Sequence, residues 1–231
     1  KRLRGAHEAK VTLRQDLTAY HDCGPFGREH AYVGVDVRRT ETLLEVLADY
    51  HPAVVVNAVG IVKQRADAKE SIPSIEINAL LPHRLAVLCR AMGARLIHLS
   101  TDCVFSGRSG NYRETSLPDP EDLYDRSKLL GEVRDGHCMT LRTSMIGPEL
   151  KRKTGLLEWF LAQSGTIKGY RSAIFSGFTT LEMSRIIERL AVEFPRAHGL
   201  YHVSSDPISK YDLLMLIKRK LELKVEIVPD D

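Results

Sequence analysis

The sequence predicts an α/β fold in which helices cover both faces of a doubly wound parallel sheet, joined to a small α+β lid. Strand-like and helix-like segments alternate along most of the chain, as in parallel strands joined by crossover helices. Residues 53–57 (Ala-Val-Val-Val-Asn) form an unbroken apolar run, typical of a strand buried on both faces. After Arg142 the predicted elements become shorter. We therefore expect a sheet domain over residues 1–143 and a smaller region over 144–231, with 177–193 returning to the sheet domain.

The individual elements follow from local patterns. Thr40 can cap a helix that runs to Tyr50, because leucines at 43, 44 and 47 share one face of it. A second helix is expected over about 73–92, kinked or divided at Pro82, whose ring removes a backbone donor. The remaining expected strands are 9–14, 94–100, 139–142, 200–203 and 224–228, and the remaining expected helices are 122–133, 156–163, 180–193 and 209–221.

Composition excludes several classes of protein. A net charge of +3 over 231 residues gives no basic excess that would indicate nucleic-acid binding. No run approaches the roughly 18 apolar residues of a membrane span, and nothing resembles a signal peptide, so a cytoplasmic location is expected. Neither the four cysteines nor the nine histidines show metal-ligand spacing, so no metal site is expected.

The strongest chemical signal is a tyrosine and a lysine on one predicted helix. Tyr124 and Lys128 are four residues apart and therefore share a face of that helix. A free tyrosine has a pKa of about 10, and a nearby ammonium favours the phenolate and lowers that pKa. Thr101, at the end of the strand over 94–100, can add a hydroxyl. The same spacing also occurs in ordinary surface pairs, so the pair alone does not establish a site.

Several motifs in a fixed order make the signal specific. They are Leu-Ser-Thr-Asp-Cys-Val-Phe-Ser-Gly at 99–107, Asn-Tyr-x-Glu at 111–114, Tyr-x-x-x-Lys at 124–128, Val-Asn-Ala-Val-Gly at 56–60, Asn78, Leu-Arg-Thr-Ser at 141–144, and Gly-Phe-Thr-Thr at 177–180. Together they resemble the dTDP-4-dehydrorhamnose reductases, extended short-chain dehydrogenases with a Rossmann-type fold, over about residues 35–203. Thr179 stands where that family usually has a proline.

The resemblance implies roles for individual residues. Tyr124 would donate a proton, Lys128 would lower the pKa of Tyr124 and bind the nicotinamide ribose, and Thr101 would hold the sugar carbonyl. Residues 1–143 would then be the dinucleotide-binding domain and residues 144–231 mainly the substrate-binding region. The expected substrate contacts are Thr101, Asp102, Val104 and Arg142, together with the loop cations Lys151 and Arg152, whose charge suits the diphosphate although a solvated loop is the simpler interpretation. The expected cofactor contacts are Arg14, Asp36, Val37, Asn57, Ala58, Val59, Gly60, Tyr124 and Lys128, and for Asp36 a surface acid is an equally good interpretation.

The sequence departs from the family in one feature of cofactor binding, and it leaves a choice between NADP and NAD. The family opens with a Gly-x-x-Gly-x-x-Gly turn that holds the pyrophosphate, and the chain contains no such turn. We expect the first strand, turn and helix to be missing from these residues; the other interpretation is that the protein does not hold a dinucleotide normally. Arg14 at a strand end suits the 2′-phosphate of NADP, although NAD is also compatible and a solvated arginine is the simpler interpretation.

The expected activity is NAD(P)H-dependent reduction of the C4 ketone of a nucleotide-linked 4-keto-6-deoxysugar, in the biosynthesis of dTDP-rhamnose and polysaccharides. The expected partner is therefore a nucleotide-diphosphate sugar, and the expected assembly a homodimer. Two alternatives stay open: a nucleotide-sugar epimerase of the same fold, and a non-catalytic regulatory subunit like the β subunit of methionine adenosyltransferase. Cys103 stands where related dehydratases carry a glutamate base, so dehydratase activity is not expected.

Overall fold

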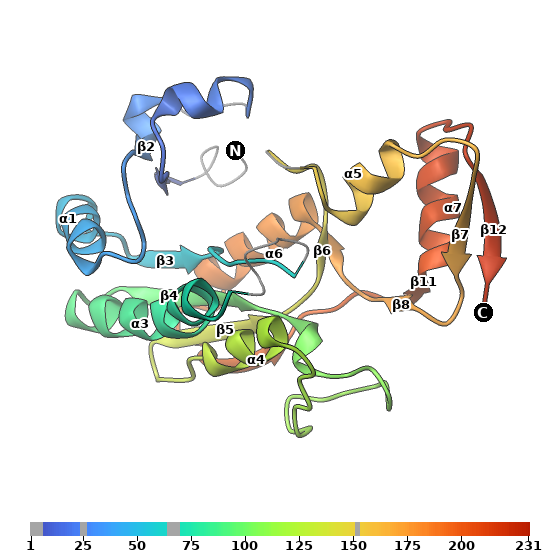
Figure 1. Cartoon of the computed structure of the whole chain (residues 1–231). Coiled ribbons are helices and arrows are strands. Elements are labelled where there is room, and N and C mark those ends of the chain that lie inside the picture. The colour runs from blue at the N-terminus through green and yellow to red at the C-terminus, as the bar shows by residue number, and fades with distance from the viewer. Residues whose placement is uncertain (1–6, 24–26, 64–69, 151–152) are drawn as a thin grey trace. The chain divides into compact units, whose positions relative to one another are not determined.

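The computed structural model describes residues 7–23, 27–63, 70–150 and 153–231 (Figure 1). The chain divides into two compact units. The first comprises residues up to Thr143 together with Ser184–His202, and the second comprises Ser144–Met183 with Val203–Asp231. The dinucleotide-binding and substrate-binding roles of the two parts stay predictions.

The first unit is built on a four-stranded parallel sheet with the order β10-β5-β4-β3. The strands are β3 (Val54–Asn57), β4 (Arg95–Ser100), β5 (Cys138–Arg142) and β10 (Gly199–His202). All residues of β4 and β5 are buried, as expected of central strands with both faces covered. Because the strands are parallel, the residues that end them lie along one edge of the sheet: Asn57, Ser100, Arg142 and His202.

Helices cover both faces of this sheet, which confirms the predicted α/β fold. In Figure 1, α3 (Leu81–Ala91) and α4 (Leu123–Leu130) lie in front of the sheet and α6 (Thr180–Val192) lies behind it. Leucines of α3 and of α1 (Thr40–Tyr50) form a hydrophobic cluster with Leu96 of β4. This cluster uses the apolar face of α1 that the spacing of Leu43 and Leu47 predicts.

The predicted kink at Pro82 takes a different form. The segment contains α2 (Ser71–Ser74), a π-helical stretch η5 (Ile75–Leu80), and then α3, with Pro82 in the first turn of α3. A π-helical turn bonds residues five apart, so it accommodates a proline that cannot donate to the residue four before it. The helix is therefore divided before the proline rather than at it, and the wide turn directs Asn78 into the protein interior.

Two short strands precede α1. They are β1 (Val11–Thr12) and β2 (Ala31–Tyr32), which form a separate two-stranded parallel sheet, and short 3₁₀ turns, η2 (Leu17–Cys23) and η3 (Arg28–His30), connect them. The strand predicted over 9–14 is thus shorter than expected. Only two residue pairs of this sheet are in register.

The second unit is α+β. It contains α5 (Leu156–Leu161) and α7 (Lys210–Lys220), with the strand pairs β6 (Met145–Ile146) and β9 (Phe178–Thr179), β7 (Thr166–Tyr170) and β12 (Glu226–Asp230), and β8 (Ile174–Phe175) and β11 (Ile208–Ser209). Its core consists of Phe160, Leu214, Val225 and Ile227. Gly177, before β9, is required by packing, because a side chain there would overlap the Ser144 carbonyl oxygen.

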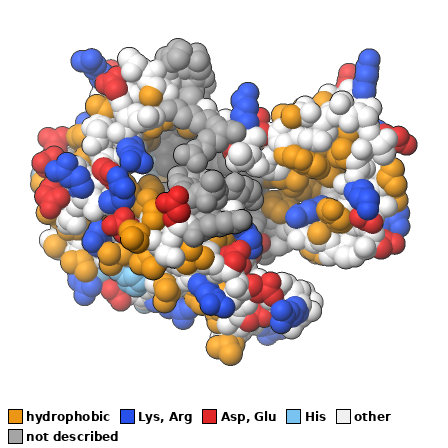
Figure 2. Space-filling view, viewed as in Figure 1, with side chains coloured by type: hydrophobic (Ala, Val, Ile, Leu, Met, Phe, Trp, Pro, Cys, Tyr) orange, Lys and Arg blue, Asp and Glu red, His pale blue; other side chains and the backbone are white. Residues whose placement is uncertain are grey.

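The surface carries mixed charge. On the face seen in Figure 2, lysine and arginine side chains are interspersed with aspartate and glutamate. Among the described residues, none of the helices combines the length and apolar character that crossing a membrane requires.

A glycine at the end of α4 provides a test of this packing. A methyl group on Gly131 would overlap the backbone carbonyl oxygen of Asn78, which cannot move without shifting η5. We expect Gly131→Ala to lower the free energy of unfolding by about 2 kcal/mol, measured by urea denaturation. Gly136→Ala is the matched control, because its methyl group meets no atom within 4 Å. Equal losses in the two variants would contradict this account of the α4–η5 contact.

Candidate functional site

The candidate site lies at the edge where the parallel strands end. Thr101 directly follows β4 and caps the short 3₁₀ turn η6 (Asp102–Val104): its hydroxyl accepts a hydrogen bond from the Cys103 amide at 3.1 Å. The Thr101 hydroxyl also lies 3.3 Å from a carboxylate oxygen of Asp102. The side chain is buried, so this turn fixes its orientation at the strand end.

Helix α4 brings the tyrosine and the lysine to the same place. Asp122 caps the helix by accepting a hydrogen bond from the Asp125 amide, and Lys63 pairs with the Asp122 carboxylate at 2.7 Å. Tyr124 lies in the first turn and its phenol is hydrogen-bonded to Thr101. One turn later, the Lys128 ammonium donates to the Leu99 carbonyl oxygen at 2.7 Å. The structure thus brings Thr101, Tyr124 and Lys128 together from a strand end and one helix.

Burial sets the electrostatics of this cluster. It raises the pKa of Tyr124 to about 12, against which the Thr101 hydrogen bond acts only partly. Burial also lowers the pKa of Lys128 to about 8, and the Glu132 carboxylate opposes that shift. The predicted lowering of the Tyr124 pKa is therefore wrong for this structure, because desolvation is the largest cause of the shift and raises that pKa. At neutral pH Tyr124 holds its proton.

The turn after β3 lies beside the cluster. The buried Asn57 side chain accepts a hydrogen bond from the Val59 amide at 3.1 Å and contacts His98 Nδ1 of β4 at 3.1 Å. The turn leaves Ala58 and Val59 exposed. Asn78 fixes the following residue, because its side chain bonds both the amide and the carbonyl of Ile61. Hydrogen bonds from the buried Asn57 and Asn78 side chains therefore fix the turn, and its small apolar side chains are exposed.

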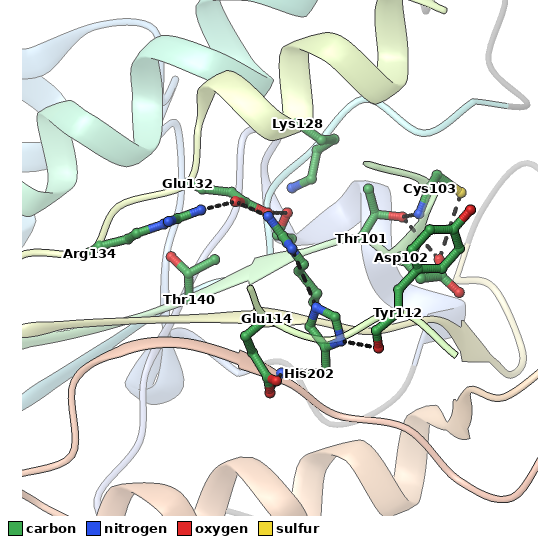
Figure 3. Close-up of polar contacts among 12 residues, drawn as sticks. Thr101, Asp102, Cys103, Tyr112, Glu114, Lys128, Glu132, Arg134, Thr140 and His202 are labelled. Atoms are coloured by element: carbon green, nitrogen blue, oxygen red, sulfur yellow. Dashed lines mark hydrogen bonds and ion pairs between the residues drawn. The ribbon is translucent and has the colours of Figure 1, made fainter. Parts of the chain in front are cut away.

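Arg142 is not available to a substrate, which corrects its predicted role. Its guanidinium makes two bonds to the Glu132 carboxylate, at 2.6 and 2.8 Å, and the two side chains are 1% and 2% exposed. Ser100 and Arg134 also donate to this carboxylate, and Figure 3 shows the Arg134 side chain pointing toward Glu132. Sequence reasoning missed Glu132; the available signal was an acidic residue one turn after Lys128.

A histidine connects this ion pair to a surface loop by contacting both. His202 Nε2 lies 3.3 Å from Arg142 Nη1, and His202 Nδ1 lies 3.2 Å from the Tyr112 carbonyl oxygen (Figure 3). Because arginine only donates, Nε2 must accept and Nδ1 must carry the proton. The His202 amide also donates to Glu114 at 2.8 Å. The Asn-Tyr-x-Glu segment is therefore anchored to the end of β10, a role that the motif alone did not reveal.

Other predicted contacts have mixed outcomes. The Val104 side chain is fully buried, so its predicted substrate contact is wrong. Val37 packs partly against the hydrophobic cluster, and the Asp36 carboxylate bonds the Arg38 side chain, which holds the pKa of Asp36 at about 2. The exposed Arg14 lies 4.0 Å from Asp36. Lys151 and Arg152 lie outside the described residues, and no group of potential metal ligands occurs in the part of the chain that the structure describes.

The sequence is similar to a known protein family and to several characterised proteins. Residues 11–154 match the family model described as RmlD substrate binding domain. The dTDP-4-dehydrorhamnose reductase of Burkholderia thailandensis is 32% identical over 139 residues, which cover 58% of this chain and 45% of that protein. The methionine adenosyltransferase 2 subunit beta of Xenopus laevis is 37% identical over 89 residues, covering 38% of this chain and 26% of that protein. The chain thus spans about half or less of the length of these two relatives.

Solved structures share the fold at low identity. A dTDP-4-dehydrorhamnose reductase from Bacillus anthracis in complex with NADP has a TM-score of 0.76 and 22% identity, covering 96% of this chain and 84% of that one. The Bordetella bronchiseptica enzyme WbmG in complex with NAD has a TM-score of 0.76 and 18% identity, covering 99% and 75% of the two chains. These similarities support the predicted fold class.

The buried ion pair makes a prediction about stability. Glu132→Gln would leave the Arg142 guanidinium buried without a counter-charge, so we expect a loss of about 3 kcal/mol or more in the free energy of unfolding. Arg134→Gln is the control, because Arg134 contacts the same carboxylate but is more than half exposed. That variant should change stability by less than about 1 kcal/mol. Similar losses of stability in the two variants would contradict the view that the buried Arg142 contact of Glu132 stabilises the fold more than the exposed Arg134 contact does.

Lys128 makes a prediction about pH. Its pKa is about 8 in the folded chain and 10.5 when free, so the unfolded chain binds more protons between these values. Stability attributable to Lys128 should therefore rise with pH across this window. Between about pH 8 and pH 10 we expect wild type to gain about 2 kcal/mol in the free energy of unfolding relative to Lys128→Met, measured by urea denaturation. A constant difference would show that the folded-state pKa is not lowered.

Proposed function

Because the chain belongs to the RmlD substrate binding domain family, we propose that it acts as a nicotinamide-dependent oxidoreductase that reduces a nucleotide-linked keto-sugar. The observation that carries the proposal is the convergence of the Thr101 hydroxyl, the Tyr124 phenol and the Lys128 ammonium where β4 ends. In doubly wound sheets, ligands bind outside the carboxyl ends of the strands, which is where these groups lie. The relatives named as dTDP-4-dehydrorhamnose reductases support the substrate class.

The finer proposal is reduction of the C4 ketone of a 4-keto-6-deoxysugar. Tyr124 is the acid, because its raised pKa keeps the phenol protonated at neutral pH until the developing alkoxide accepts the proton. Thr101 orients the carbonyl oxygen next to that phenol. Asp102, which is exposed at the start of η6, contacts the sugar. When bound, the nicotinamide supplies the hydride.

Part of the chain fits the cofactor. The Lys128 ammonium has three donors, and among the described residues its one hydrogen bond goes to Leu99, which leaves donors for the ribose hydroxyls. In the Asn57–Gly60 turn, Ala58 and Val59 are small or apolar and exposed, so the ribose end of the dinucleotide can approach this backbone closely. The sequence has no glycine-rich turn for the pyrophosphate, so we assign no residue to that group.

We propose NADP as the preferred cofactor and accept NAD as compatible. The exposed Arg14 cation supports NADP, because it can pair with a 2′-phosphate. The structural relatives include complexes with each nucleotide, NADP in the Bacillus anthracis reductase and NAD in WbmG. A WbmG complex with NAD and UDP supports a nucleotide-diphosphate sugar as the partner. A homodimer and a cytoplasmic location stay predictions.

The second candidate function is that of a non-catalytic regulatory subunit. The observation that favours it is the 37% identity to methionine adenosyltransferase 2 subunit beta. The discriminating experiment compares two readouts on the purified chain: oxidation of NADPH with dTDP-4-keto-6-deoxy-L-mannose, and co-purification with a methionine adenosyltransferase. Turnover supports the reductase. A stable complex without turnover supports the regulatory subunit.

The acid is tested by removing one hydroxyl. We expect Tyr124→Phe to lower turnover by roughly 10²-fold or more, the usual size of a general-acid contribution, with folding intact by circular dichroism. Tyr50→Phe is the matched control, because the Tyr50 hydroxyl bonds the Glu8 carbonyl oxygen away from the cluster. An unchanged rate in Tyr124→Phe, measured on a substrate that wild type reduces, would remove Tyr124 from the mechanism.

A further inference from the structure

An open cavity lies at the edge of the sheet opposite to the candidate site, where the parallel strands begin. Its volume is about 520 Å³. Arg95 begins β4, His137 directly precedes β5, and His198 directly precedes β10, so all three belong to the amino ends of the strands. Thr101 and Lys128 lie at the carboxyl ends. The cavity is lined by Arg90, Gly93, Ala94, Arg95, Gly136, His137, Pro195, Arg196, Ala197 and His198, all in the first unit.

Arg95 brings an uncompensated positive charge to this cavity. The residue is 9% exposed, and its two terminal nitrogens donate to the carbonyl oxygens of Leu190 and Ala197, each at 2.8 Å. Its Nε is buried without a partner, and among the described residues the side chain forms no ion pair with a carboxylate. Carbonyl dipoles satisfy hydrogen bonds but do not cancel a full charge. A buried cation is ordinarily paired with an anion.

The other charged residues that line the cavity are also positively charged. Arg196 is exposed and forms no ion pair within the described part of the chain. Arg90 is more than half exposed and pairs with the Asp135 carboxylate at 3.1 Å. None of the residues that line the cavity is acidic. The cavity therefore combines one buried cation with two exposed arginines, of which Arg90 is paired with Asp135.

We propose that this cavity binds a phosphate-type oxyanion, carried by a small organic molecule. Arg196 and Arg90 would make charge-assisted hydrogen bonds to the oxyanion, and Arg95 would supply the fixed charge that attracts it. Ala94, Pro195 and Ala197 give the cavity an apolar wall for the organic part. Gly93 and Gly136 leave space above their backbone, since a methyl group on either meets no atom within 4 Å.

The site is separate from the one proposed for catalysis. β4 connects the two, with Arg95 at its start and Ser100 at its end, so one ligand does not bridge them by direct contact. The proposal therefore does not depend on the reductase activity. It predicts a ligand that increases the stability of the first unit in proportion to its occupancy, because it binds only the folded chain.

The test uses the full chain and inorganic phosphate or pyrophosphate as probes, at constant ionic strength. We expect saturable binding by calorimetry and a rise in the melting temperature. Arg196→Gln should weaken binding about tenfold, because one charge-assisted hydrogen bond is lost. Arg219→Gln, an exposed arginine on α7 in the second unit, is the matched control and should bind as wild type does. Arg95→Gln should also weaken binding; if it does not fold, Arg196→Gln still decides.

The location of binding is read from amide chemical shifts. Changes at Gly93, Gly136 and Ala197 support the proposal. Changes centred on Ala58, Gly60 and Thr101 would show that the probe binds the proposed catalytic site, which overturns this inference and leaves the proposed function intact. Absence of saturable binding up to millimolar probe, or equal weakening in Arg219→Gln, overturns it as well.

Discussion

The first unit depends on one buried ion pair, Glu132 with Arg142. Glu132 follows α4 and Arg142 ends β5, so the pair fixes the helix that carries Tyr124 and Lys128 against the sheet. A lone buried charge is costly, and this one is compensated by two short bonds and by the Ser100 hydroxyl. The guanidinium then bonds His202 and lies over the Phe105 ring, 5.0 Å from its centroid. One ion pair thus organises a helix, three strand ends and a loop.

The strands were predictable because burial leaves a direct trace in sequence. A continuous apolar run predicted β3, and leucine spacing predicted α1. The short strand β2 and the π-helical turn before Pro82 left no such trace, since they depend on contacts with residues distant in sequence. Arg142 and Val104 belong to motifs that the family shares, and motif membership cannot distinguish a residue that touches substrate from one that supports the site. Both proved to be supporting residues.

The candidate site shows a second limit of the same kind. The spacing of Tyr124 and Lys128 predicted that they share a helix face, and the structure places both at the end of β4. The lowered pKa expected for Tyr124 from the same spacing is wrong, because desolvation depends on how much of the surrounding fold covers the phenol and spacing does not show this. Burial shifts the two pKa values in opposite directions. It raises the pKa of Tyr124, so the phenol keeps its proton, and it lowers the pKa of Lys128, so the ammonium loses its proton more easily. Both shifts favour the neutral form of each group.

The two edges of the sheet handle buried charge differently. At the carboxyl edge, Arg142 meets a carboxylate, a histidine and an aromatic ring, so its charge is compensated within the chain. At the amino edge, Arg95 is also buried, yet its hydrogen bonds reach only backbone carbonyls and a methionine sulfur. Burial lowers the pKa of Arg95 but an arginine stays charged. The two buried arginines therefore differ in their counter-charge. Arg142, which is compensated, supports the site, while Arg95, which is not, leaves a positive field in an open cavity.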